Sequence, residues 1–247
     1  MERLKREDGE TIAYLARGGK PPGLVWLGGF KSDMTGTKAQ ALAQWAEREG
    51  RALVRFDYFG HGASSGDFRG GTISHWKADA LAVIDTLTTG PQVLIGSSMG
   101  GWIALLAALA RPKRVAGLLL IAPAADFTED LMWAHLPEDA KRDIMEKGEW
   151  IWPTNYGEEP YPITRKLIED GRKNLILDGP IVLNVPVHIL QGMQDPDVPW
   201  MHAIKTAERI EGDVTLTLIK NGDHRLSTPP DLARMLGALE GLLANIK

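Results

Sequence analysis

The sequence predicts an α/β fold in which a mostly parallel sheet is covered by helices on both faces. Runs that are apolar throughout, such as residues 24–27 and 115–121, are typical of strands buried on both sides. Segments with helical periodicity alternate with these runs, which is the pattern of parallel strands joined by crossover helices. The chain has 247 residues, of which 44% are hydrophobic, so it is long enough for one large core.

Each strand predicted for the sheet is a short apolar run bounded by a turn signal. The N-terminal segment 4–17 differs, because the charged turn at residues 7–10 divides it into the two strands of a hairpin. The other predicted strands are residues 24–27, 52–56, 92–95, 115–121, 187–190 and 214–219.

Each predicted helix has apolar residues at helical spacing or is apolar on every side, and its ends carry residues that begin or stop helices. Gly50 stops the first helix, Ser74 caps the second, and Pro199 precedes the fourth. The predicted helices are residues 37–49, 74–88, 102–110, 200–209 and 229–246.

The regular alternation breaks between residues 124 and 183. This insert contains several tryptophans and prolines, and it predicts two or three short helices without a sheet strand. It directly follows a strand, at the edge where α/β sheets bind their ligands, so we expect a helical cap over that edge. The expected organisation is a core of residues 1–123 and 184–247 with a cap of residues 124–183. The alternative is an irregular surface excursion.

Composition excludes several classes of protein. The net charge of −4, without a strongly basic face, argues against a nucleic-acid partner. The chain has no cysteine, and none of its six histidines has the spacing of a metal site, so we expect neither a metal nor a cofactor. The longest apolar stretch, residues 102–110, is too short for a membrane span, and the charged residues 1–8 lack the apolar core of a signal peptide. We therefore expect a cytoplasmic protein.

The motif Gly96-Ser97-Ser98-Met99-Gly100 lies between a predicted strand and a predicted helix. A serine on such a turn, with glycine two residues away on each side, is typical of a nucleophile elbow. Glycine lets the strand and the helix pack closely, and the start of the helix favours developing negative charge. The glycine spacing centres on Ser98 and leaves Ser97 as a neighbour.

Two further residues complete a candidate catalytic triad. A serine hydroxyl needs a general base to become a nucleophile, and a carboxylate must orient that base when it is a histidine. In folds with a nucleophile elbow, the chain order is serine, acid, histidine. Ser98, Asp195 and His224 occur in that order, each just after a predicted strand. Asp197 and Asp223 are the alternative acids.

An oxyanion hole would need two donors near Ser98. One expected donor is the backbone N–H of Met99, which directly follows the serine. The other is the N–H of Phe30, because Gly28-Gly29 lets the backbone turn towards the site after a strand. The alternative is that residues 28–30 form a plain turn. His61, between two glycines, is more typical of a residue that shapes a turn.

Several stretches carry a more specific likeness that extends from about residue 13 to the final helix. They are residues 29–39, 55–60, 90–102, 110–112, 191–195, 198–200 and 223–225. These stretches resemble the family of mitochondrial α/β-hydrolases that are palmitoyl-protein thioesterases and acyl-glucuronide hydrolases. The resemblance implies the α/β-hydrolase fold and implies that Ser98, Asp195 and His224 are the catalytic triad. The cap is less alike than the core.

These observations predict a serine esterase or thioesterase whose substrate is a small-molecule or acylated-protein ester or thioester. Met132, Trp133, Trp150 and Trp152 of the cap suit an acyl chain or an aromatic acid, or alternatively form the core of the cap. The same triad also serves peptide hydrolysis, carbon–carbon bond hydrolysis and acyl transfer. A ligand-binding protein and a scaffold with a vestigial site are the non-catalytic alternatives.

Overall fold

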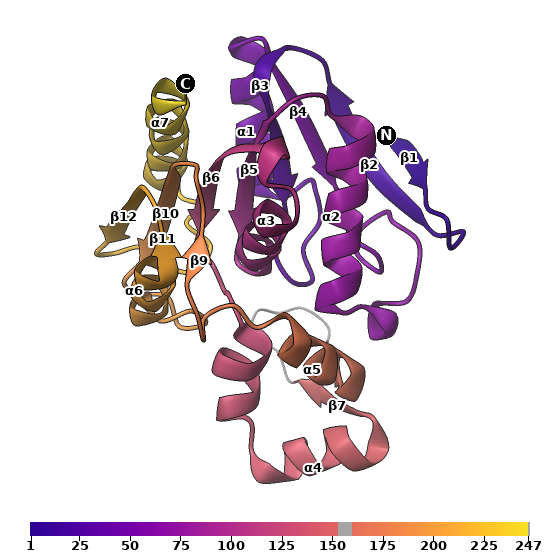
Figure 1. Cartoon of the computed structure of the whole chain (residues 1–247). Coiled ribbons are helices and arrows are strands. Elements are labelled where there is room, and N and C mark those ends of the chain that lie inside the picture. Colours follow the sequence, from indigo (N-terminus) through magenta and orange to yellow (C-terminus); the bar gives the residue numbers. More distant parts are fainter. Residues whose placement is uncertain (153–159, 247) are drawn as a thin grey trace.

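The computed structural model of the chain describes residues 1–152 and 160–246. Within them, eight strands form one central sheet in the order β1-β2-β4-β3-β5-β6-β10-β12 (Figure 1). The strands are β1 (Glu2–Lys5), β2 (Thr11–Arg17), β3 (Lys20–Leu27), β4 (Arg51–Phe56), β5 (Gln92–Ser97), β6 (Val115–Ile121), β10 (Val187–Gly192) and β12 (Val214–Ile219). The first three in the sheet pair antiparallel, and all later neighbours pair parallel. The predicted fold is confirmed.

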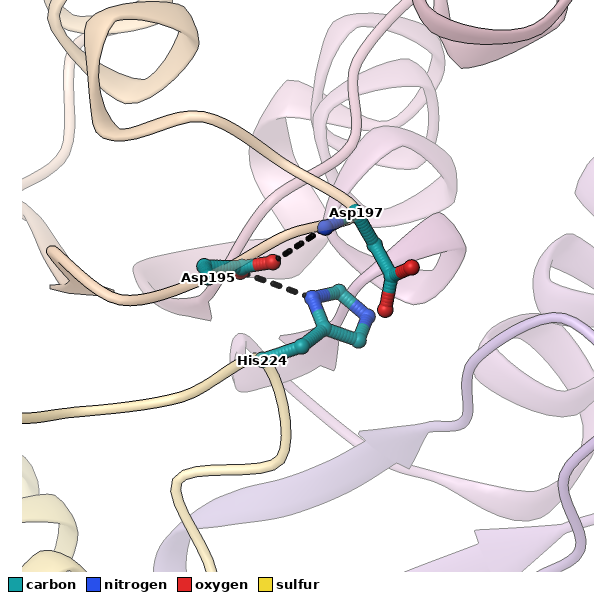
Figure 2. A group of neighbouring side chains, drawn as sticks. All are labelled: Asp195, Asp197 and His224. Atoms are coloured by element: carbon teal, nitrogen blue, oxygen red, sulfur yellow. Dashed lines mark hydrogen bonds and ion pairs between the residues drawn. The ribbon is translucent and has the colours of Figure 1, made fainter. Parts of the chain in front are cut away.

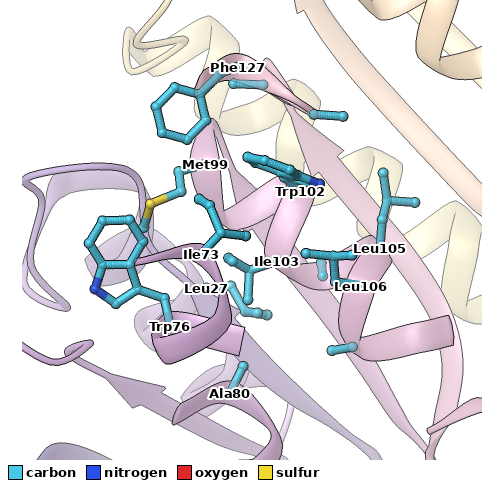
Figure 3. Close-up of a cluster of buried hydrophobic side chains, with 14 of the residues drawn as sticks. Leu27, Ile73, Trp76, Ala80, Met99, Trp102, Ile103, Leu105, Leu106 and Phe127 are labelled. Carbon is cyan, nitrogen blue, oxygen red and sulfur yellow. The ribbon is translucent and has the colours of Figure 1, made fainter. Parts of the chain in front are cut away.

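Helices cover both faces of this sheet (Figure 1). They are α1 (Thr37–Arg48), α2 (Ile73–Leu87), α3 (Met99–Ala110), α6 (Trp200–Arg209) and α7 (Pro229–Asn245). Buried side chains of α1 and α7 pack on one face, and those of α2, α3 and α6 pack on the other. Figure 3 shows part of the cluster beneath α2 and α3, in which Trp76 of α2 and Trp102 of α3 are fully buried. In the part of the chain that the structure describes, no helix is both long and apolar enough to cross a membrane.

The insert between β6 and β10 forms a separate layer at one end of the sheet (Figure 1). Its elements are the π-helix η3 (Thr128–Met132), the 3-10 helices η4 (Trp133–His135) and η5 (Arg172–Asn174), the helices α4 (Glu138–Lys147) and α5 (Arg165–Gly171), and the strands β7 (Glu149–Trp152), β8 (Tyr161–Thr164) and β9 (Ile181–Val182). Residues 153–159 of the expected cap lie outside the described residues.

We expected a purely helical insert, but the insert also contains strands. Its strands β7 and β8 pair with each other in an antiparallel hairpin, and β9 pairs with β11 (Ile210–Glu211) outside the central sheet. Gly148, with φ +92°, ends α4 in the left-handed conformation and turns the chain into β7. The aromatic and β-branched residues of β7 then favour a strand. Among the described residues, no strand of the insert joins the central sheet, as we expected.

The parallel arrangement brings four loops to the same edge of the sheet. The strands β3, β5, β10 and β12 point in one direction, so their carboxyl ends lie together beside the start of the insert. The loops after these strands carry Phe30, Ser98, Asp195 and His224. Residues that are far apart in the sequence can therefore form one site at this edge.

Candidate active site

The turn around Ser98 holds the backbone in a strained conformation. Ser98 lies between β5 and α3 with φ 55° and ψ −121°, a region that residues other than glycine rarely adopt. Its glycine neighbours are required by space. A Cβ on Gly100 would lie 2.1 Å from the carbonyl oxygen of Leu27, and one on Gly96 would lie 2.3 Å from that of Gly100. The motif therefore forms the sharp strand-to-helix turn that exposes the serine hydroxyl.

Three loops bring Ser98, His224 and Asp195 into one hydrogen-bonded chain. The Nε2 atom of His224 lies 3.1 Å from the Oγ atom of Ser98. The Nδ1 atom of the same ring lies 2.8 Å from Oδ2 of Asp195 (Figure 2). An ionised carboxylate only accepts, so Nδ1 carries the proton and Nε2 is free to accept the serine proton.

The carboxylate of Asp195 is held by donors on both oxygens. Oδ1 accepts the backbone N–H groups of Asp197 at 2.9 Å and Val198 at 2.8 Å. Oδ2 accepts the side-chain amide of Gln191 at 3.0 Å in addition to His224. Asp195 is buried, and these bonds fix its orientation towards the imidazole.

The two alternative acids occupy different positions. The side chain of Asp223 accepts the N–H of Leu226 at 2.9 Å and so closes the turn after the histidine. Asp197 is exposed, and its carboxylate lies beside the imidazole rather than on the Nδ1 side (Figure 2). Asp195, Asp197 and His224 offer ligand atoms within 4.8 Å of one another, as a cation would require. Both carboxylate oxygens of Asp195 and the Nδ1 atom of His224 are already engaged in hydrogen bonds.

The loop after β3 passes directly beside the serine. A Cβ on Gly29 would lie 3.4 Å from the Cβ of Ser98, and one on Gly100 would lie 2.5 Å from the carbonyl oxygen of Gly28. The next residue, Phe30, packs its ring against Phe68, Trp76, Phe127 and Tyr161, with ring centroids 5.0 to 5.8 Å apart. The loop is therefore anchored beside Ser98. Met99 begins α3, so its N–H is among those that lack an intrahelical partner.

A cavity of about 960 Å³ opens at Ser98 and His224. Of the four cap residues expected to contact substrate, Met132 and Trp152 line this cavity, whereas Trp133 and Trp150 are not among its described lining residues. The ring of Trp133 instead lies 4.8 Å from the guanidinium of Arg172, and Trp150 packs edge-on against Trp152 at 5.6 Å.

Several lining residues were missed by the sequence reasoning. Phe127, Leu131 and Tyr161 add apolar surface on the insert side of the cavity. Phe127 could have been found, because it follows closely after the end of a sheet strand, as the other site residues do. Leu131 and Tyr161 carry no such signal, since they belong to the π-helix and the hairpin of the insert.

Lys38 of α1 links the histidine loop to the core and was also missed. Its Nζ atom donates a hydrogen bond to the backbone carbonyl of Arg225, the residue after His224. Burial lowers the pKa of Lys38 to about 8, and the nearby charge of Asp223 partly offsets this change. The contact restrains the loop that presents the imidazole.

Comparisons with known proteins agree with this fold. Residues 25–168 match the family model described as serine aminopeptidase, S33. The mitochondrial palmitoyl-protein thioesterase ABHD10 of Pongo abelii is 39% identical over 242 residues, which cover 97% of this chain and 79% of that protein. A crystal structure from Agrobacterium vitis S4 matches with a TM-score of 0.94 and 45% identity over 100% of this chain and 98% of the other. Alpha/beta hydrolase domain-containing protein 10 from mouse matches with a TM-score of 0.92 and 36% identity, covering 100% and 99%.

The cytoplasmic location predicted from the sequence is wrong by this comparison. Relatives from Pongo abelii, human and mouse, each of which matches 97% of the chain, are named as mitochondrial proteins. The prediction depended on a charged N-terminal segment and on the absence of cysteine. The first argues only against a secretory signal, and the second fits any reducing compartment, so neither distinguishes the cytoplasm from mitochondria.

Proposed function

This chain belongs to the α/β-hydrolases of the serine aminopeptidase S33 family, with ABHD10 among its relatives, and we propose that it is a serine hydrolase of thioesters and esters. The observation that carries the proposal is the hydrogen-bonded chain from Asp195 through His224 to Ser98, at the opening of a large cavity. The relatives named palmitoyl-protein thioesterases support an acyl thioester as substrate.

In the proposed mechanism, the Oγ atom of Ser98 attacks the carbonyl carbon of the substrate while Nε2 of His224 takes the hydroxyl proton. Asp195 holds the Nδ1–H and stabilises the imidazolium that forms. Negative charge develops on the carbonyl oxygen, which accepts the backbone N–H groups of Met99 and Phe30. His224 then gives its proton to the leaving thiol or alcohol, and an acyl-enzyme remains.

The second half of the reaction repeats these roles with water as the nucleophile. His224 removes a proton from the water, the hydroxide adds to the acyl carbon, and the oxyanion again accepts the two backbone N–H groups. When the tetrahedral intermediate collapses, the bond to Ser98 Oγ breaks and His224 returns the proton to the serine. The products are a carboxylic acid and a thiol or an alcohol.

We further propose that residues 124–183 act as the cap that binds the acyl group, over a core of residues 1–123 and 184–247. The insert side of the cavity is largely apolar. Its lining includes Phe127, Leu131, Met132, Trp152 and Tyr161. Such side chains stabilise a bound acyl chain or aromatic acid by removing its apolar surface from water.

Turnover of a matched panel of substrates tests the proposal. The panel contains p-nitrophenyl esters and S-acyl thioesters of acyl groups from acetyl to palmitoyl, with an aminoacyl p-nitroanilide to test the aminopeptidase activity that the family description names. We expect ester and thioester turnover that falls by about 10⁴-fold or more in Ser98→Ala, since removal of a triad nucleophile has effects of this order.

The neighbouring serine provides the matched control. We expect Ser97→Ala to keep turnover within about threefold of the original protein, because the Ser97 hydroxyl is not part of the hydrogen-bonded chain from Asp195 through His224 to Ser98. A fluorophosphonate probe should label the original protein and Ser97→Ala but not Ser98→Ala. Full turnover by Ser98→Ala, or cleavage of the p-nitroanilide alone, would contradict the proposal.

A further inference from the structure

The direction of the Phe30 N–H depends on the peptide unit that it shares with Gly29. In a trans peptide, the C=O and the N–H point in opposite directions, so fixing one fixes the other. The carbonyl oxygen of Gly29 accepts two hydrogen bonds from Ser32, one from its backbone N–H at 3.2 Å and one from its Oγ at 2.8 Å. These bonds fix the direction of the Gly29 carbonyl, and the N–H of Phe30 therefore points to the opposite side of the peptide unit.

The next peptide unit is held by His61. The N–H of Lys31 donates to Nε2 of His61 at 3.1 Å, so this nitrogen is an acceptor. The other nitrogen, Nδ1, lies 3.0 Å from the carbonyl oxygen of Phe59, and as a donor it fixes the tautomer of the ring. Lys31 has a φ of 57°, a conformation that needs support from its surroundings in a residue with a side chain.

The surroundings of His61 suit a permanent hydrogen-bond acceptor. The side chain is 4% exposed, and its ring lies edge-on to Trp76 and Phe68 at 5.3 and 5.2 Å. Burial lowers its pKa to about 4, so the ring stays neutral and keeps its Nε2 lone pair at the pH where a triad histidine is active.

A buried carboxylate ties the two loops together. Asp57 accepts the N–H of Met34 at 2.7 Å and the N–H of Ala63 at 2.8 Å. The first donor follows the loop that contains Phe30, and the second belongs to the turn that contains His61. The distance between Lys31 and His61 is therefore set by the core rather than by the exposed loop itself.

From these contacts we infer that Ser32 and His61 are positioning residues that direct the Phe30 N–H towards the oxyanion. The inference rests on the proposed function. The Ser32 hydroxyl donates to the Gly29 carbonyl and the His61 ring accepts the Lys31 N–H, so both side chains act through the backbone. Loss of their hydrogen bonds would let the peptide units at Phe30 rotate, and the donor would be misplaced when charge develops in the transition state.

The first test replaces His61 by leucine and by glutamine. We expect His61→Leu to lower kcat by about 10- to 100-fold with KM within about threefold, since loss of a whole oxyanion donor costs about 10²- to 10³-fold. In His61→Gln, the amide oxygen can accept the Lys31 N–H and the amide nitrogen can donate to Phe59, so kcat should return to within about fivefold of the original value. His75→Leu is the control, because the His75 ring stacks on Phe59 at 4.0 Å and is not bonded to residues 28–33.

The second test uses Ser32, which is exposed, so that its variant should fold even where His61→Leu does not. We expect Ser32→Ala to lower kcat by about three- to tenfold, because the Ser32 N–H still reaches Gly29. The double variant should lose no more than about 10²- to 10³-fold, since both residues act on one donor. A boronic acid that forms a tetrahedral adduct with Ser98 should bind Ser32→Ala and His61→Leu more weakly than the original protein. The loss of affinity should follow the same order as the loss of kcat.

The results separate this inference from the proposed function. If the original protein has no turnover and is not labelled by a fluorophosphonate, the proposed function is overturned. If it is active and Ser98→Ala is not, the positioning role is overturned by wild-type kcat in Ser32→Ala and in a folded His61 variant. It is also overturned by a change confined to KM, or by failure of His61→Gln to exceed His61→Leu. Melting temperature and circular dichroism identify the folded variants.

Discussion

The two walls of the cavity, one from the core and one from the insert, are held in place by different kinds of contact. On the core wall, each candidate catalytic atom belongs to a loop after a sheet strand and is fixed by hydrogen bonds, as the four donors to Asp195 illustrate. On the insert wall, the described lining is mostly aromatic and aliphatic side chains that pack as part of a hydrophobic cluster. This difference suggests that the core wall provides geometry and the insert wall provides volume.

Polar contacts attach the insert to the core at several places along its length, and others join the two ends of the insert to each other. Asp126 accepts the N–H groups of Ile176 and Leu177, which join the outgoing and returning segments. His202 of α6 lies with Nε2 2.7 Å from the carbonyl oxygen of Ala125. Substitutions should therefore have different consequences on the two sides, and the predictions below compare them.

The largest effect is expected on the core wall. Asp195→Asn should lower kcat by about 10⁴-fold with little change in KM, because the amide cannot hold the imidazole in the required tautomer. Steady-state kinetics on a p-nitrophenyl ester measure this loss. Asp197→Asn is the matched control, since Asp197 is an exposed neighbour with the same side chain, and it should stay within about fivefold of the original kcat. A larger loss in Asp197→Asn than in Asp195→Asn would assign the acid differently.

The sequence indicated the core wall better than the insert wall, and the reason is the range of the interactions involved. The strand before Ser98 is an apolar run, and the glycines that flank the serine stand within five residues of each other, so a local pattern carries the information. Trp133 and Trp152 are two tryptophans of one insert, yet of these two only Trp152 is among the described lining residues of the cavity. Trp152 lies on the hairpin of β7 and β8, whereas Trp133 lies on η4, and the pattern of the sequence does not show this pairing.

The contact between His61 and Lys31 was beyond local reading for a related reason. The sequence suggested that His61 shapes a turn, and its ring does lie in one. The bond from the Lys31 N–H crosses 30 positions and depends on a positive φ at a lysine. Neither feature has a signature in composition or periodicity, whereas the position of the loop after β3 follows from the order of the strands.

An intermediate and substrate-dependent effect is expected on the insert wall. Trp152→Ala should lower kcat/KM for long-chain acyl substrates by about tenfold, because loss of an apolar contact of this size costs about 1–3 kcal/mol. Acetyl substrates should change by less than about threefold. Kinetics across the acyl series of the substrate panel measure this selectivity.

The control for this experiment is another tryptophan of the insert. Trp133→Ala removes a ring that is outside the described lining of the cavity, so it should affect all chain lengths alike. Equal losses for short and long chains in Trp152→Ala would contradict a role of the insert in acyl selection.

The smallest effect is expected where the insert joins the core. Burial raises the pKa of Asp126 to about 6, although backbone donors at Leu177 and Ile176 partly oppose this. A carboxyl whose pKa is higher in the folded state binds more protons there than in the unfolded chain, so its contribution to stability declines as the pH rises from about 4 to about 6. Asp126→Asn keeps an oxygen acceptor, tolerates the φ of 55° and cannot ionise. When the pH is raised from 4.5 to 7.5, the melting temperature should therefore fall less, or rise more, in the variant than in the original protein. Turnover of acetyl esters should stay unchanged, and an opposite shift would show that the ionised carboxylate stabilises this junction.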